Sequence, residues 1–340
     1  MSDIINQLSS QPLPSSPRVL FMGTPDFAVP ALNALYEWCE SCGGEVVAVV
    51  SQPDRPKGRG KKLQRTPVAA AADKLGLVCY QWPRLSQESY DALCALKYDL
   101  AVVIAYGKIL PKRYLILPPW GCVNLHASLL PAYRGAAPIQ WALINGESET
   151  GVSVMRLDEG MDTGPIAHRL SCAIESEDCS ATLFDTLSAL SAQALIEALE
   201  LWVTPGSESA LRFERQSDEG VSHAPMLQKS DGELNWSSSA KELQNLCRGV
   251  NPWPGAQTSL ANEVLKVKSL IAIDEADLEE YQKSLGLGRV IMLAKNGPMV
   301  RCSDGAVILT EVQRPSKKPT TGSDFYRGYE LEIGSLLSEC

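Results

Sequence analysis

The chain has 340 residues, a formal net charge of -9 and a pI of about 5.0. That length predicts one large domain with a smaller one, and the acidic average excludes a protein that coats nucleic acid through its overall charge. A concentrated basic patch stays compatible with these values. The 10 cysteines are scattered along the chain, which is not typical of a disulfide scaffold.

The first seventeen residues, 1–17, are rich in Ser, Pro and Gln and contain no Lys or Arg. They lack the basic start of a secretory signal and the Arg content of a transit peptide. No apolar run reaches the length of a membrane span. We therefore expect a flexible N-terminal extension on a cytoplasmic, monomeric protein that has no membrane partner.

Short apolar segments alternate with helical patterns from Arg18 onward. The expected strands are residues 19–22, 45–50, 78–81, 100–105, 121–126, 152–157 and 166–173. The expected helices are residues 27–40, 66–75, 86–96, 136–144 and 182–203, with Ser180 as the N-cap of the last. Because the apolar runs are continuous, the pattern predicts an α/β fold with a Rossmann-like, doubly wound, mostly parallel sheet.

The C-terminal part has a different texture. Short β-rich segments at 257–259, 264–273, 288–293, 299–301 and 306–312 are separated by Gly, Asp and Asn. This spacing predicts a smaller C-terminal β-barrel, OB-like in size. The expected organisation is an extension over 1–17, an α/β domain over 18–205, a linker over 206–222 and a β-barrel domain over 223–335.

A candidate catalytic pair stands at the end of one apolar strand. Asn124 and His126 are two residues apart and therefore share one face of that strand. The carboxyl ends of parallel strands form the ligand crevice of an open α/β sheet. There an imidazole can accept a proton, and a carboxamide can donate to an oxyanion. A polar strand end satisfied by solvent is the alternative, but the Pro- and Gly-rich stretch from Ser128 to Pro138 is shaped to line a pocket.

An acidic turn from Asp158 to Gly164 offers a carboxylate partner. Its glycines allow a tight loop that carries Asp162 back across the end of the sheet. A carboxylate beside His126 would fix the tautomer of the ring and stabilise the imidazolium. A plain solvated turn is the alternative, and the acids are too few and wrongly spaced for an EF-hand.

Two other patterns predict no bound group. Cys39 and Cys42 form a C-x-x-C, but no second cysteine pair or nearby His completes a set, so we expect no metal. Residues 23–27 stand where a Rossmann phosphate loop would lie. Their sequence, G-T-P-D-F, is not G-x-G-x-x-G, so we expect no dinucleotide.

A basic segment follows the second expected strand. Between Arg55 and Arg65 there are six basic residues and no acidic one. Interleaved Gly and Pro exclude a helix, which predicts a mobile positive loop. A solvated loop is the ordinary interpretation of a charge run, but beside the crevice it can reach RNA phosphates. The candidate RNA contacts are Arg55, Lys57, Arg59, Lys61, Lys62 and Arg65, with Arg314, Lys317 and Lys318 as a weaker extension.

Three motifs together resemble the folate-dependent formyltransferase/hydrolase family. They are Asn124-x-His126, the S-L-L-P-x-x-R-G-x-x-P loop and the D-x-G-x-D-T-G turn, within residues 100–170. The resemblance implies Asn124, His126 and Asp162 as the catalytic set. It also implies a folate pocket formed by Ser128, Leu129, Leu130, Pro131, Tyr106 and Gly107.

Segments 21–28, 52–62 and 248–256 resemble the members of this family that formylate the methionine of initiator methionyl-tRNA. This resemblance runs from Arg18 to about Gly328, and the extension before Arg18 departs from it. It implies 10-formyltetrahydrofolate as co-substrate and initiator methionyl-tRNA as partner, with the C-terminal domain assisting tRNA binding. Glycinamide ribonucleotide, an amino-sugar nucleotide or water are the alternative acceptors. A catalytically idle RNA-binding protein is the alternative from another class.

Overall fold

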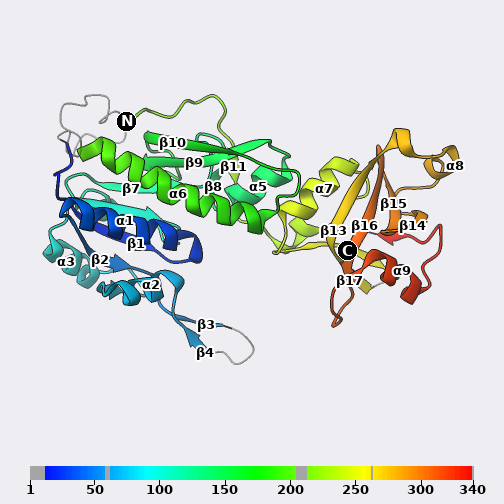
Figure 1. Ribbon diagram of the computed structural model, residues 1–340, viewed down its shortest axis with the longest axis horizontal. Helices are drawn as coiled ribbons and strands as arrows, with labels where there is room; N and C mark the ends of the chain where they lie inside the picture. Colours follow the sequence, from blue (N-terminus) through cyan, green and yellow to red (C-terminus); the bar gives the residue numbers. More distant parts are fainter. Residues whose placement is uncertain (1–11, 58–61, 204–212, 262, 339–340) are drawn as a thin grey trace. The chain divides into compact units, whose positions relative to one another are not determined.

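The computed structural model describes residues 12–57, 62–203, 213–261 and 263–338, which form two compact units (Figure 1). Unit 1 contains the described residues within Met1–Gly135, Glu149–Cys172 and Phe184–His223. Unit 2 contains those within Ala136–Ser148, Ala173–Leu183 and Ala224–Cys340.

Unit 1 is built on a seven-stranded sheet with the order β10-β9-β7-β6-β1-β2-β5. The strands are β1 (Arg18–Gly23), β2 (Glu45–Val50), β5 (Cys79–Tyr80), β6 (Leu100–Ile104), β7 (Cys122–His126), β9 (Glu149–Arg156) and β10 (Ile166–Ala173). The five strands from β7 to β5 pair in parallel, whereas β9 runs antiparallel to β7. The carboxyl ends of these five strands therefore share one edge of the sheet.

Helices cover both faces of this sheet (Figure 1). They are α1 (Val29–Cys42), α2 (Pro67–Leu75), α3 (Gln87–Leu96) and α6 (Ser180–Val203). On one face, Leu20 and Met22 of β1 pack with Leu93 of α3 in one buried cluster. On the other, the ring of Phe27 meets Phe184 of α6 edge to face, at 5.1 Å between centroids. Burial on both faces is the reason why these strands read as continuous apolar runs.

Local signals set the ends of the helices. The Thr66 and Ser86 hydroxyls cap α2 and α3 by accepting from the backbone N–H of Ala69 and Ser89. Gly43 and Gly76 end α1 and α2 with φ of 71° and 72°, where a residue with a Cβ is strained.

Unit 2 carries an antiparallel sheet with the order β14-β15-β16-β13-β12-β18, and β17 pairs with β16. The strands are β12 (Ala256–Leu260), β13 (Glu263–Asp274), β14 (Val290–Ala294), β15 (Gly297–Cys302), β16 (Gly305–Gln313), β17 (Thr320–Thr321) and β18 (Leu337–Ser338). Leu243 and Cys247 of α7 (Ala240–Gly249) pack into its core. The predicted fold class, a mostly parallel α/β sheet followed by a smaller β domain, is confirmed.

The remaining elements are short. They are β3 (Arg55–Lys57), β4 (Lys62–Gln64), α4 (Lys112–Leu115), β8 (Arg134–Gly135), α5 (Pro138–Ile144), β11 (His223–Ala224), α8 (Glu280–Lys283), α9 (Gly322–Tyr329) and the 3-10 turns η2 (Asp26–Ala28), η3 (Lys229–Gly232) and η4 (Glu275–Asp277).

Two local predictions need correction. The basic segment was expected to be a mobile loop, but β3 and β4 pair as an antiparallel hairpin in which Arg55 lies opposite Gln64. Proline excludes a helix but is compatible with an edge strand. Ser180 was expected to be an N-cap, yet it is the first residue of α6, and its hydroxyl donates to the Gly249 carbonyl.

The C-x-x-C cysteines lie at the end of α1, where both are free thiols. Burial raises the pKa of Cys39 to about 12, which leaves it a packed thiol at neutral pH. Within the described ranges, no group of three or more His, Cys, Asp or Glu side chains is placed to hold a metal ion. Among the described residues, no helix is both long and apolar enough to cross a membrane.

Candidate active site

Asn124 and His126 lie on one face of β7, at the carboxyl end of the sheet of unit 1. Asn124 pairs with Val103 of the neighbouring parallel strand and with Met155 of the antiparallel strand β9. Its side chain is half-buried and makes no hydrogen bond to any described residue. A carboxamide held by a central strand but left unbonded is available to donate to a substrate oxygen.

His126 is 6% exposed, and each of its two ring nitrogens faces an oxygen of another residue. Nε2 lies 2.8 Å from the Tyr133 carbonyl oxygen, and Nδ1 lies 3.7 Å from Oδ2 of Asp162. A carbonyl only accepts, so the neutral ring carries its hydrogen on Nε2, and Nδ1 is the nitrogen with a lone pair. The Tyr133 carbonyl, rather than Asp162, therefore sets the tautomer. The carboxylate is placed to stabilise the ring once Nδ1 is protonated.

Asp162 reaches His126 because its loop folds back tightly. Its φ is 55°, in the left-handed region, and Oδ2 accepts from the Gly135 backbone N–H at 2.9 Å. At Gly164 a Cβ would overlap the Arg156 carbonyl oxygen, so only glycine fits there. Asp158 closes the start of the loop by accepting from the Thr163 hydroxyl at 2.7 Å. Of the three residues selected for catalysis, the structure thus brings His126 and Asp162 together and places Asn124 on the same face of β7 as His126.

Gln216 is a residue of this site that the sequence analysis missed. Its side-chain Nε2 donates to the carbonyls of Asp162 and Gly164, at 2.8 and 2.7 Å. Its Oε1 accepts from Nε and Nη2 of Arg134, at 3.1 and 2.6 Å. With 5% exposure, Gln216 ties the Asp162 loop to the loop that follows His126. A single Gln so far along the chain carries no sequence signal for this role.

The loop after His126 is organised by serine hydroxyls. Ser128 Oγ donates to the Ala132 carbonyl at 2.6 Å. Ser153 Oγ donates to the Ser128 carbonyl at 2.7 Å and accepts from the Leu130 N–H at 3.0 Å. Leu130 is buried against Met155, whereas Leu129 and Pro131 are half-buried. Of these expected folate contacts, Ser128 and Leu130 thus hold the loop, and Leu129 and Pro131 are the more accessible.

A cavity of about 550 Å³ opens at the carboxyl ends of β1, β2 and β6. Its lining includes Tyr106 and Gly107, two of the expected folate contacts, but not the three catalytic candidates. The Gln52 amide fixes this rim by donating to the Tyr106 and Gly107 carbonyls, at 3.0 and 2.9 Å. Since β7 adjoins β6 in parallel, His126 and the cavity share one edge of the sheet.

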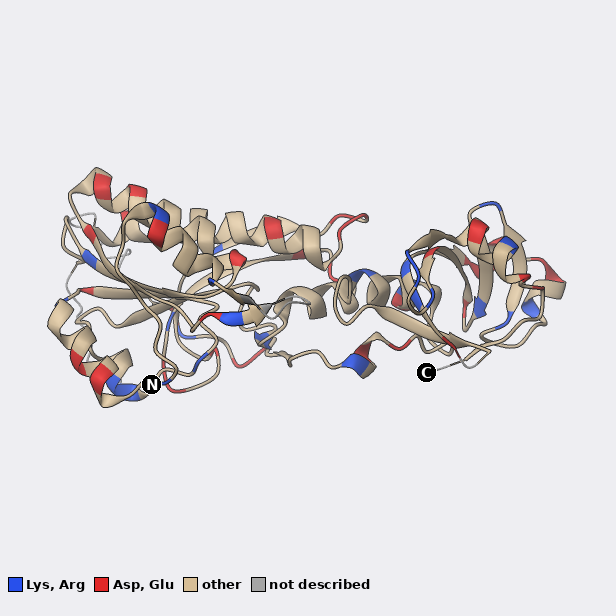
Figure 2. Cartoon of the chain, turned by 90° about the horizontal axis from the view of Figure 1, so that it is seen from below, with Lys and Arg blue, Asp and Glu red and all other residues tan. Residues whose placement is uncertain are grey.

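The β3–β4 hairpin borders the same cavity through Arg55, Pro56 and Gln64. Arg55 is exposed and donates from Nη2 to the Gln52 side chain at 2.8 Å. Lys57 and Lys62 belong to the two strands, whereas Arg59 and Lys61 lie outside the described residues. Basic and acidic residues are scattered over both units (Figure 2). The six basic residues from Arg55 to Arg65, with no acidic one among them, are therefore a local feature of an acidic protein.

The fold and the site define a formyl transferase: the chain belongs to the formyl transferase family. The family's model matches residues 17–199, and the model of the formyl transferase C-terminal domain matches residues 226–330.

Several methionyl-tRNA formyltransferases are similar along nearly the whole chain. That of Pelotomaculum thermopropionicum is 42% identical over 324 residues, which is 95% of this chain and 99% of that protein. That of Geobacter sulfurreducens is 40% identical over 95% of this chain and 97% of that protein.

Solved structures share the fold at low identity. A crystal structure of the N-formyltransferase from Helicobacter canadensis, complexed with folinic acid and dTDP-3-aminofucose, matches with a TM-score of 0.61 and 16% identity, over 88% of this chain and 99% of that one. HypX from Aquifex aeolicus, complexed with tetrahydrofolic acid, matches with a TM-score of 0.58 and 16% identity, over 94% of this chain. The chain spans about half of HypX, 48% of its length.

Proposed function

We propose that this protein transfers the formyl group of 10-formyltetrahydrofolate to the free amino group of methionine on initiator methionyl-tRNA. One observation carries the proposal. His126 shares one face of β7 with Asn124 and lies 3.7 Å from Asp162, in a chain that is 42% identical, over 95% of its length, to a methionyl-tRNA formyltransferase. The basic hairpin beside the cavity supports an RNA acceptor over a small amine.

The chemistry needs a base, a charge partner and an oxyanion donor, and each has a candidate. The amine attacks the formyl carbon in its neutral form, and His126 takes a proton from it at Nδ1. Asp162, 3.7 Å away, stabilises the imidazolium that results, while Nε2–H stays bonded to the Tyr133 carbonyl. The Asn124 amide donates to the formyl oxygen as negative charge develops on it. The bond between the formyl carbon and N10 of the folate then breaks, and the His126 imidazolium returns its proton to N10.

The two substrates are assigned to neighbouring parts of the same sheet edge. The formylated folate lies along Ser128 to Pro131 and the Tyr106–Gly107 turn, with its formyl group toward Asn124. The acceptor end of the tRNA approaches from the hairpin side, where Arg55, Lys57, Arg59, Lys61 and Lys62 meet phosphates. The cavity volume of about 550 Å³ lies within the range of about 300–1,000 Å³ that is usual for small-molecule sites.

The test is transfer of labelled formyl from 10-formyltetrahydrofolate to three acceptors in parallel: methionyl initiator tRNA, glycinamide ribonucleotide and an amino-sugar nucleotide. We expect transfer to the tRNA alone, slowed by about 10²–10⁴ in His126→Ala. Transfer to a small acceptor, or release of formate to water, with no product on the tRNA would keep the catalytic residues and overturn the acceptor assignment.

A further inference from the structure

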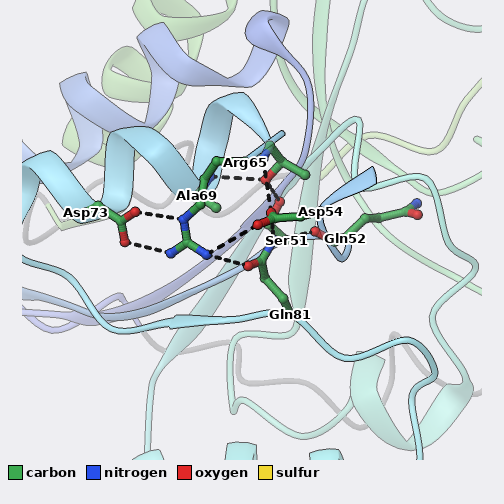
Figure 3. A network of polar contacts seen from close by, with 8 residues as sticks. Ser51, Gln52, Asp54, Arg65, Ala69, Asp73 and Gln81 are labelled. Carbon is green, nitrogen blue, oxygen red and sulfur yellow. Dashed lines mark hydrogen bonds and ion pairs between the residues drawn. The ribbon is translucent and has the colours of Figure 1, made fainter. Parts of the chain in front are cut away.

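A polar network closes the base of the basic hairpin, and Arg65 is at its centre (Figure 3). The guanidinium donates from Nε and Nη2 to the two carboxylate oxygens of Asp73 on α2, at 2.7 Å each. Nη1 donates to Oε1 of Gln81, just after β5, at 2.6 Å. The planar fork of arginine matches a carboxylate in this two-bond geometry, which fixes direction as well as distance.

The same network joins both ends of the hairpin. Asp54, immediately before β3, accepts at Oδ1 from the Gln81 side chain at 2.7 Å and from the Thr66 N–H at 3.3 Å. Thr66 follows Arg65, and its hydroxyl bonds to Ser51 at 2.7 Å while it caps α2. The segments that enter and leave the hairpin are thus connected to each other and to α2 (Figure 3).

The charge of Arg65 is already balanced within the protein. Asp73 accepts two of its bonds, and the carboxylate of Asp54 lies 3.9 Å from Nη1. The hydrogen bond from Arg65 keeps the pKa of Asp73 below its usual value. Arg55 is different, because its guanidinium has no carboxylate partner among the described residues. Arg55 and Arg65, at the two ends of the hairpin segment, therefore differ in what they can offer to a phosphate.

We propose that Arg65 is a positioning residue: its paired contact with Asp73 sets the angle at which the β3–β4 hairpin projects from the rest of unit 1. This angle in turn places Arg55 at the rim of the cavity. Arg65 then supports the hairpin and does not itself bind a phosphate. The proposal rests on the proposed function only in taking tRNA as the partner of the hairpin. Exposed ion pairs add little to global stability, so the effect is on the hairpin rather than on folding.

The direction in which one substitution changes the KM for tRNA distinguishes a positioning residue from a phosphate ligand. Asp73→Asn removes an acidic charge next to the hairpin, so if Arg65 met a phosphate directly the KM for tRNA would fall or stay unchanged. If Arg65 is a positioning residue, the same substitution frees Arg65 from its contact with Asp73, and the KM for tRNA rises by about two- to fivefold with kcat unchanged. Glu37→Gln on α1 is the matched control, since this exposed acid pairs with no described residue.

A double-variant cycle extends the test. Arg65→Gln should raise the KM for tRNA as Asp73→Asn does, and the two together should be no worse than either alone. Exchange of the pair, Arg65→Asp with Asp73→Arg, should restore part of the loss. If Arg65→Gln and Asp73→Asn raised the KM for tRNA additively, and exchange of the pair restored nothing, the positioning role of Arg65 would be wrong.

A measurement without tRNA keeps the two proposals distinguishable. Trypsin cleavage after Lys57 in the full-length protein reports opening of the hairpin. We expect faster cleavage in Arg65→Gln and Asp73→Asn than in the wild type and Glu37→Gln, at unchanged Tm. Equal cleavage rates in all four proteins would contradict the positioning role of Arg65. Faster cleavage in Arg65→Gln and Asp73→Asn, together with no formylation of tRNA by the wild type, would overturn the proposed function alone.

Discussion

The surroundings of His126 and the base of the basic hairpin hold functional residues in different ways. Around His126 the contacts are buried and made largely to backbone: the Tyr133 carbonyl, the Gly135 N–H and the two carbonyls bound by Gln216. At the hairpin the bonds of Arg65 run between exposed side chains, and the side chains of Arg65 and Asp73 are 40% and 53% exposed.

This difference matches what each region has to do. Acyl transfer requires reacting atoms to be placed within a fraction of an ångström, which buried bonds to the main chain can enforce. Binding of an RNA backbone tolerates small displacements, because charge acts over a Debye length of about 8 Å at physiological salt. Substitutions around His126 should therefore reduce turnover, and substitutions in the hairpin should alter KM and salt dependence.

The largest expected effect is that of His126→Ala. Removal of the base should lower kcat by about 10²–10⁴. The KM for tRNA should change little, because the hairpin is intact. Steady-state formylation over a range of tRNA concentrations measures both quantities, and a loss confined to KM would contradict the role of His126 as base.

Asn124→Ala should have the next largest effect. One oxyanion donor is worth about 10²–10³ in kcat. Because the Asn124 amide bonds to no described residue, its loss should leave the Tm close to the wild-type value. A parallel fall in Tm and kcat would instead indicate that Asn124 supports β7. Turnover near that of the wild type would remove Asn124 from the mechanism.

Much of this architecture could be predicted from sequence because burial on both faces leaves continuous apolar runs. The strands around Leu20 and Val102 are examples. The catalytic candidates could also be predicted from local patterns, because alternation places Asn124 and His126 on one face of a strand and glycines mark the Asp162 turn.

What sequence could not supply are bonds that depend on how distant segments pack. The Tyr133 carbonyl sets the tautomer of His126 through its backbone, which its side chain does not report. Gln216 lies 54 positions after Asp162. In the sequence Arg65 is one more positive charge of the basic segment, whereas in the structure it bonds to Asp73 and Gln81.

Gln216→Leu tests whether the buried bonds around Asp162 control turnover. The substitution leaves two loop carbonyls and the Arg134 guanidinium without their partner, which should cost about 1–3 kcal/mol in the free energy of unfolding. A displacement of Asp162 by about 1 Å would lower kcat by up to about 10². Steady-state kinetics and thermal unfolding measure both effects.

Gln193→Leu is the matched control for this substitution, since Gln193 is exposed on α6 and bonds only to Glu197 within the described parts of the chain. We expect it to change neither kcat nor Tm. If Gln216→Leu lowered the Tm but left kcat unchanged, Gln216 would stabilise the loop without positioning Asp162.

The smallest expected effect is that of Arg55→Gln, and it tests the hairpin side of the comparison. Loss of one phosphate contact should raise the KM for tRNA a few-fold and reduce the slope of log KM against log salt by about 0.9, with kcat unchanged. Lys97→Gln is the control, because this exposed residue precedes β6 and so lies at the opposite edge of the sheet. An equal change of slope in both variants would mean that the tRNA responds to overall charge, and that Arg55 makes no specific contact.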